Sequence, residues 1–195
     1  RFDQVEGSVI TPEVGGLEGA LAGNASITEH GPRGKAYPDF TAKNVALNLS
    51  GAGQFLRIKD PGAESILDFA QGDSITMEAW VNPQTMGKYS YVIGKGRTGN
   101  PGQKADNQNY SLRLAQLGSS AGITFLFRDA KNSGDNSWHR WTSKTGFALG
   151  GWHHVAISYT FGKPETIRGY IDGEPVKGVW DKGGATDQDP WVDDD

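Results

Sequence analysis

The chain has 195 residues, a formal net charge of −4 and no cysteine. This length is usual for one domain, and an all-β chain of this size buries enough apolar surface to need no disulfides. The negative charge argues against a nucleic-acid partner, the missing cysteines exclude thiolate chemistry, and no apolar run approaches the about 18 residues of a membrane-spanning helix.

Short extended segments dominate the sequence, and each is closed by Gly, Asn, Asp or Pro. The 28 glycines and 9 prolines indicate many turns, and only residues 61–70 (PGAESILDFA) offer a short helix. Strands are predicted over residues 45–50, 54–60, 74–83, 89–96, 109–115, 122–130, 138–144, 153–161, 166–173 and 174–180. This spacing predicts an all-β fold, an antiparallel two-sheet jelly-roll sandwich with one buried face per sheet.

Alternation along these segments predicts which side chains face the core, because successive strand residues point to opposite faces. In residues 74–83, one face takes Ile75, Met77, Ala79 and Val81. In residues 45–50, it takes Val45, Leu47 and Leu49. In residues 153–161, His153 joins the apolar set and His154 lies opposite. The two imidazoles therefore cannot readily bind one ion together, and we interpret them as structural.

Residues 171–175 (IDGEP) carry a strong hairpin signal, because Asp-Gly suits the positive φ angles of a type I′ turn. The signal predicts that residues 166–171 pair with residues 174–180.

Four segments together resemble the laminin-G-like, concanavalin-type jelly-roll family. They are SITMEAWVNP, YSYVIGKG, NYSLRL, and the stretch GWHHVAISYT followed by the Asp-Gly hairpin. The resemblance is best over residues 45–178 and implies one concanavalin-like domain over residues 1–195, with two packed antiparallel sheets, one of them concave. The family has a further strand after the hairpin. That strand is either missing here or replaced by the N-terminal EGSVI segment (residues 6–10).

The resemblance also implies the setting of the domain. Similar domains are inserted in large exported or surface proteins of bacteria, so we expect an extracytoplasmic location and flanking domains as neighbours. The fold alone does not give an activity, because it carries lectins, adhesion modules, enzymes and structural inserts.

The outward-facing positions form the candidate ligand-binding surface, for a glycan or a protein. Aromatic rings stack on sugar faces while charged groups supply directed hydrogen bonds. The set consists of Glu78, Trp80, Arg113, Arg128, His154, Arg168 and Tyr170. We predict a non-catalytic recognition module that binds carbohydrate; the alternative is a protein-interaction or architectural domain without a glycan ligand.

Enzymatic activity is the less favoured reading. A retaining glycosidase needs two carboxyl groups about 5–5.5 Å apart, and Glu78 is the only acid in its strand. A hydrolase or lyase using Glu78 or His154 stays open as a third hypothesis. The Gly-x-Gly-x-x-Gly pattern of residues 94–99 is followed by loop composition rather than a helix, so we read it as a hairpin connection.

Calcium is the one cofactor that the sequence suggests, since the family resembled here often holds a structural calcium at the rim of the sandwich. Ca²⁺ prefers carboxylate and carbonyl oxygens in loops. Asp60 lies at a predicted strand end and is the candidate ligand, with the C-terminal acids as possible partners.

Overall fold

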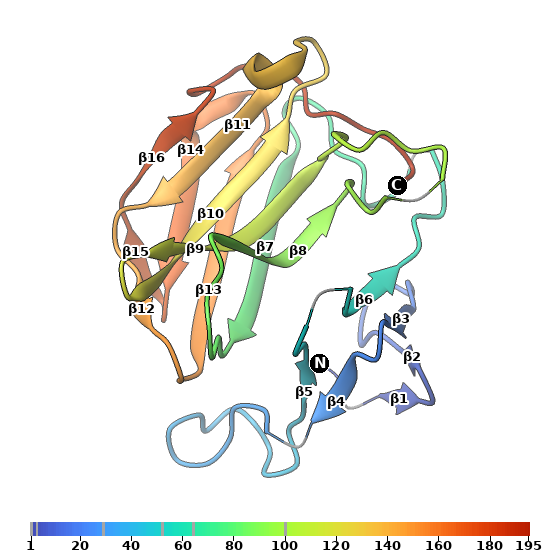
Figure 1. Cartoon of the computed structure of the whole chain (residues 1–195), viewed down its shortest axis with the longest axis vertical. Coiled ribbons are helices and arrows are strands. Elements are labelled where there is room, and N and C mark those ends of the chain that lie inside the picture. The colour runs from blue at the N-terminus through green and yellow to red at the C-terminus, as the bar shows by residue number, and fades with distance from the viewer. Residues whose placement is uncertain (1, 3, 29, 52, 64, 100) are drawn as a thin grey trace. The chain divides into compact units, whose positions relative to one another are not determined.

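The structure is a computed structural model that describes residues 2, 4–28, 30–51, 53–63, 65–99 and 101–195. The chain divides into two compact units, residues 1–60 and residues 61–195. Strands make up most of the regular structure of both (Figure 1). The short helix candidate at residues 61–70 forms no helix in its described part, where the chain makes turns and irregular structure. Within the described chain, no helix has the length and apolar character to cross a membrane.

The first unit contains short strands. They are β1 (Val5–Glu6), β2 (Val9–Ile10), β3 (Gly19–Ala22), β4 (Ser26–Thr28), β5 (Ala46–Asn48) and β6 (Phe55–Ile58). One sheet has the order β1-β2-β3-β6, and β4 pairs with β5. The EGSVI segment therefore pairs with β3 and does not supply a last strand after the hairpin. The predicted inward face of residues 45–50 is also wrong: Ala46 is buried and Leu49 is exposed.

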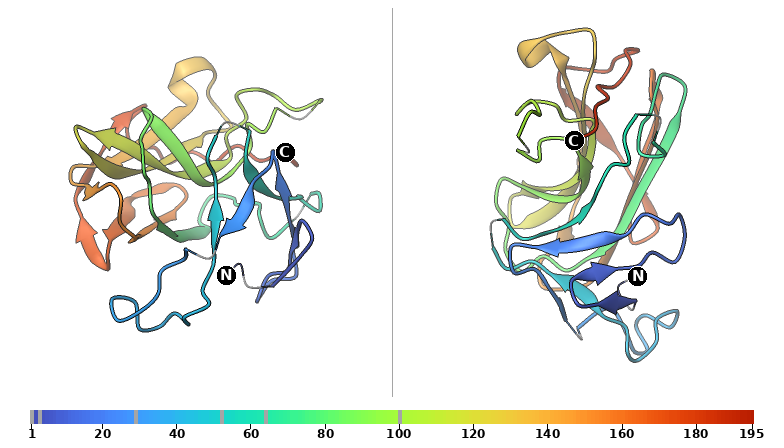
Figure 2. Two further views of the ribbon diagram at one scale, coloured as in Figure 1. Left: turned by 60° about the horizontal axis from the view of Figure 1, so that its bottom comes forward. Right: turned by 90° about the vertical axis from the view of Figure 1, so that its right-hand side faces the viewer.

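The second unit is the sandwich. Its elements are β7 (Ser74–Val81), β8 (Tyr89–Lys95), β9 (Tyr110–Leu117), β10 (Ser120–Arg128), the 3₁₀ turn η1 (Gly134–Ser137), β11 (Trp138–Ser143), β12 (Phe147–Ala148), β13 (His153–Thr160), β14 (Lys163–Ile171), β15 (Glu174–Val176) and β16 (Gly178–Lys182). Two antiparallel sheets face each other (Figure 2). The predicted two-sheet, all-β architecture is confirmed.

We call the two layers the front sheet and the back sheet. The front sheet has the order β15-β14-β13-β7, and the back sheet has the order β16-β11-β10-β9-β8, with β12 added beside β10. In the front sheet, β13 pairs with β7 on one side and with β14 on the other. The strand with the two histidines is thus central, and its neighbours fix which side chains lie beside it.

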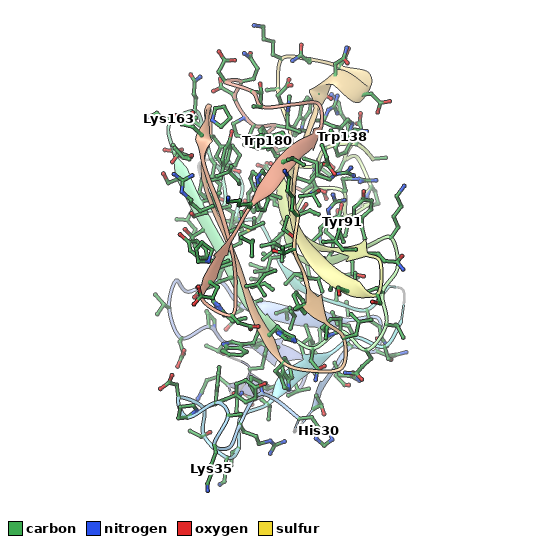
Figure 3. All side chains as sticks on the ribbon, turned by 90° about the vertical axis from the view of Figure 1, so that its left-hand side faces the viewer. His30, Lys35, Tyr91, Trp138, Lys163 and Trp180 are labelled. Atoms are coloured by element: carbon green, nitrogen blue, oxygen red, sulfur yellow. The ribbon has the colours of Figure 1, made fainter. Side chains whose placement is uncertain are left out.

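The core lies between the inner faces of these sheets. Phe125 of β10 and Val155 and Ile157 of β13 are fully buried in it. Burial also raises the pKa of the Tyr159 hydroxyl to about 12, since a low-dielectric surrounding disfavours the phenolate. Figure 3 shows Trp180 between the two layers, where it packs against this core. The predicted apolar face of residues 74–83 is confirmed, because Ile75 and Met77 are buried there.

The strand predicted over residues 174–180 changes sheets. Residues 174–176 pair with β14 as the hairpin signal predicts, whereas β16 pairs with β11 of the back sheet. Asp172 and Gly173 both have the positive φ expected of the turn, 53° and 81°. At the crossing, a Cβ on Gly178 would lie 2.2 Å from a ring carbon of Trp141. Only glycine lets the chain pass so close to that ring.

Candidate functional site

The outer face of the front sheet carries the main candidate site. Register places Glu78 beside Ala156 and Trp80 beside His154, while Tyr170 lies on the other side of Ala156. Directly opposed residues in paired strands share a face, so these side chains point to the same side. A hollow of about 340 Å³ opens there. It is lined by Thr76, Glu78, His154, Ala156, Ile157, Ser158, Tyr170 and Gly173.

His154 connects the aromatic and acidic parts of this hollow. Its ring lies 5.4 Å from the Trp80 ring, centroid to centroid, and its Nε2 lies 3.6 Å from Glu78 Oε2. The Glu78 side chain is 66% exposed, so water screens this pair and it holds the two groups only loosely. The site therefore offers a ligand one carboxylate, one imidazole and a partly exposed indole.

Asp172 holds the histidine strand from the turn of the neighbouring hairpin. Its Oδ1 accepts a hydrogen bond from the His154 backbone N–H at 2.9 Å, and its Oδ2 lies 2.7 Å from His153 Nδ1. The His153 ring packs 4.5 Å from the Phe147 ring, away from the hollow. The prediction that the two histidines face opposite sides is thus confirmed, and each has a different neighbour.

Arg168 lies on the front sheet but turns away from the hollow. It pairs with Ser158, which lines the hollow. Its Nη1, however, donates to the carbonyl oxygens of Glu165 and Ile167 at 2.7 and 2.8 Å. The guanidinium is thus engaged with the backbone of its own strand.

Arg113 and Arg128 lie on the back sheet, so the predicted set divides between two outer faces. Arg128 is 6% exposed. Its Nε donates to Ser137 Oγ at 2.8 Å, its Nη1 forms an ion pair with Asp106, and the Trp191 ring lies 4.9 Å away. This arrangement ties the end of β10 to two loops. Strand alternation predicted that the Arg128 side chain points outward, but it did not predict that this side chain is buried.

Arg113 is also buried, with 5% of its surface exposed. Its guanidinium carbon lies 4.6 Å from the centre of the Tyr89 ring and 5.5 Å from that of Tyr91. Burial lowers the pKa of this guanidinium, and Tyr91 partly offsets the shift. The residue is therefore a cation enclosed by rings rather than an exposed contact.

The residues proposed for calcium do not form a ligand cluster in the described part of the chain, where no three His, Asp or Glu side chains converge. Asp60 follows β6 and is 9% exposed. The C-terminal carboxylates accept hydrogen bonds instead: Asp193 Oδ2 from Asn107 Nδ2 at 2.7 Å and Oδ1 from Asn109 Nδ2 at 3.0 Å. These contacts do not test calcium binding, and the calcium site stays a prediction.

The predicted set lacked five residues that line the hollow: Thr76, Ala156, Ile157, Ser158 and Gly173. Thr76, Ala156 and Ser158 share the alternation of Glu78 and His154, so the same period would have found them. The role of Asp172 in holding both histidines could not be found this way, because it depends on the register between β13 and the turn after β14.

Comparison with known proteins places the chain in a family. No curated protein and no solved structure gives a significant match. One family model matches, that of the concanavalin A-like lectin/glucanases superfamily, and it covers residues 51–192. The match spans the whole sandwich and agrees with its two antiparallel sheets, so the chain belongs to the concanavalin A-like lectin/glucanase superfamily.

Proposed function

We propose that this protein is a non-catalytic module that binds carbohydrate through the hollow on the outer face of its front sheet. One observation carries the proposal: a hollow with an acid, an imidazole and a tyrosine in its wall has a partly exposed tryptophan beside it. Trp80 is 37% exposed, and Glu78, His154 and Tyr170 line the space. Sugar sites combine such an aromatic platform with a few directed polar groups.

The distribution of carboxylates favours binding over hydrolysis. Most glycosidases need a pair of carboxyl groups across the scissile bond. Among the described residues that line the hollow, Glu78 is the only acid. His154 and the hydroxyls of Thr76 and Ser158 can bind sugar hydroxyls but do not supply the second carboxylate. This supports a role in recognition.

Affinity electrophoresis against a polysaccharide panel tests the proposal. The wild-type chain should be retarded by at least one polysaccharide, and Trp80→Ala and Tyr170→Ala should each lose retardation. Arg168→Ala is the matched control, since Arg168 lies on the same sheet but binds its own backbone. Melting temperatures within a few degrees of wild type would show that the fold survives. Retardation by no polysaccharide, or unchanged retardation of Trp80→Ala, would contradict the proposal.

The absence of catalysis needs its own assay. A polysaccharide that binds should show no new reducing ends or unsaturated products after long incubation. Turnover that disappears in Glu78→Gln or His154→Ala would replace this proposal with a hydrolase or lyase. If no glycan binds but flanking domains of a longer chain do, the domain is architectural instead. We expect the longer chain to be exported, which fractionation of the producing cell would test.

A further inference from the structure

A row of four polar side chains crosses the outer face of the back sheet, on the side opposite the hollow. Strand register places Tyr91 of β8 beside Arg113 of β9, Arg113 beside Thr124 of β10, and Thr124 beside Thr142 of β11. Since paired residues share a face, these side chains are neighbours in one line. We call three of these four residues, Arg113, Thr124 and Thr142, the back row.

The back row holds buried polar atoms that have no hydrogen-bond partner among the described residues. They are Arg113 Nε and Nη2, Thr124 Oγ1 and Thr142 Oγ1. Arg113 is 5% exposed and Thr124 is 0% exposed. Most buried polar groups in folded proteins have a partner, and one left without it costs about 1–3 kcal/mol. A ligand bound at these three neighbouring residues would supply the partners.

A ligand that suits Arg113 carries a negative charge. Three other cations on this side of the sandwich have acids: Arg128 pairs with Asp106, Arg140 with Asp181, and Lys182 with Asp135. Within the described chain, none of these acids pairs with Arg113. Its guanidinium faces Tyr89 and Tyr91, forms a hydrogen bond with Tyr91, and feels the repulsion of Arg140.

Two tyrosines cover the guanidinium and differ in exposure. Tyr89 accepts a hydrogen bond from Arg140, which is itself held by Asp181. Tyr91 is 48% exposed and donates its hydroxyl to Gln108 at 2.6 Å. Figure 3 shows Tyr91 at the outer side of the back sheet. Displacement of Tyr91 is therefore the route by which a ligand would reach Arg113.

We propose that the back row is a binding site for a carboxylate group, separate from the hollow on the front sheet. Arg113 Nε and Nη2 lie on one edge of the guanidinium, which matches the two oxygens of a carboxylate in a bidentate pair. Thr124 adds a hydroxyl donor on the next strand, and Thr142 adds one on the strand beyond it. The carboxylate belongs to an acidic sugar or to a small free acid, and the probes below distinguish the two.

Binding is tested on the intact chain by isothermal titration with galacturonate, acetate and galactose. In Trp80→Ala, which lacks the proposed glycan site, galacturonate and acetate should bind, whereas galactose should not. A preference for galacturonate identifies an acidic sugar, and equal affinities identify a free carboxylate; both support the site. Thr124→Val and Arg113→Met should weaken carboxylate binding by about tenfold or more, the usual effect of losing a charge-assisted hydrogen bond. Trp80→Ala should keep it, so failure of the glycan proposal is seen separately.

The melting temperature separates a ligand site from a structural arginine. Without ligand, Arg113→Met should leave the melting temperature unchanged or raise it, because a buried cation without an acid is replaced by an apolar chain of similar length. Carboxylate should raise the melting temperature of the wild-type chain and not that of Arg113→Met. No stabilisation by any carboxylate would show that buried water supplies the missing partners. That result, or a strongly destabilised Arg113→Met, overturns the proposal.

Discussion

The two sheets of the sandwich share one strand pattern but treat their outer faces differently. On the front sheet, the outward residues of β7 are exposed, and the Glu78 side chain keeps 66% of its surface in water. On the back sheet, the outward residues of β9 and β10 are buried as fully as the inward ones: Thr124 is 0% exposed and Arg128 is 6% exposed. Rings from β8 and the C-terminal segment cover them. The same alternation therefore yields an open face on one side and an enclosed polar layer on the other.

The difference in burial between the two outer faces should have its largest effect on the strength of ion pairs. At the end of β10, Asp129 is fully buried and lies 2.8 Å from His139 Nε2, while His139 Nδ1 lies 3.0 Å from the carbonyl oxygen of Gly184. Both ring nitrogens thus lie within hydrogen-bond distance of an oxygen. Asp129→Ala should cost about 3–5 kcal/mol of unfolding free energy, because it leaves His139 buried without its acid. Urea denaturation measures this loss.

A more exposed pair on the same sheet is the control for that variant. The Asp181 side chain is 32% exposed and pairs with Arg140 at 2.7 Å, and Asp181→Asn should cost about 1 kcal/mol or less. Similar losses in the two variants would mean that burial does not set the strength of these pairs, and the contrast between enclosed and open groups would fail.

The buried pair also predicts acid sensitivity. Burial alone would raise the pKa of Asp129, but hydrogen bonds from Asn132 and His139 outweigh it and hold the pKa below its ordinary value. A carboxyl group with a lowered folded-state pKa stabilises the fold above its unfolded pKa of about 3.9, and this contribution is lost as the pH falls through the folded value. Unfolding free energy should therefore decline below about pH 4 in the wild-type chain. Asp129→Ala should show a flatter decline, and parallel curves would contradict the assignment.

The next largest loss of unfolding free energy is expected from overpacking between the two sheets, where they approach each other closely. A Cβ on Gly169 of β14 would lie 2.6 Å from a ring carbon of Trp141, which belongs to the opposite sheet. Gly169→Ala should cost about 1–3 kcal/mol, as overpacking of a buried position does. Gly87→Ala is the matched control, since the added Cβ would meet nothing closer than 4.0 Å. A neutral Gly169→Ala would show that the Trp141 ring can shift, and that the spacing between the sheets is not fixed there.

Removal of one hydroxyl compares the two outer faces directly. Thr124→Val on the back sheet should raise the unfolding free energy by about 1 kcal/mol in buffer without carboxylates, because the buried Oγ1 has no partner in the described structure. Thr76→Val on the exposed front sheet should change it by less than about 0.5 kcal/mol. Denaturation of Thr124→Val and Thr76→Val alongside the wild-type chain measures both changes in unfolding free energy. A destabilised Thr124→Val would mean that its hydroxyl has a partner, such as buried water.

The comparison also shows where sequence reasoning succeeds. Period-two alternation placed Ile75 and Met77 inward and His154 outward, because those assignments depend only on strand geometry. It failed for the burial of Arg113, since coverage by Tyr89 and Tyr91 depends on side chains of a neighbouring strand. The hairpin turn at Asp172 was predictable from local chemistry.

The failures at strand ends have a different cause. The crossing of β16 to the back sheet depends on Gly178 passing beneath Trp141, a tertiary contact that no local pattern records. In residues 45–50, the strand that forms has only three residues. So short a segment gives too few positions to fix which face is buried, and Ala46 rather than Leu49 turned inward. In the candidate site, the outward-facing residues of the front sheet could be predicted from the sequence. The placement of Arg113 and Arg128 on the other sheet could not.

The smallest expected effect on stability sharpens the comparison furthest. Glu78→Gln should change the unfolding free energy by less than about 0.5 kcal/mol, because its 3.6 Å pair with His154 is open to water. The same variant should lower glycan affinity several-fold if the carboxylate accepts hydrogen bonds from sugar hydroxyls, as the amide is a weaker acceptor. Urea denaturation and affinity electrophoresis of one preparation measure both quantities. A loss of unfolding free energy above about 1 kcal/mol would mean that Glu78 helps to hold the front sheet together. The outer face of the front sheet would then resemble the enclosed outer face of the back sheet.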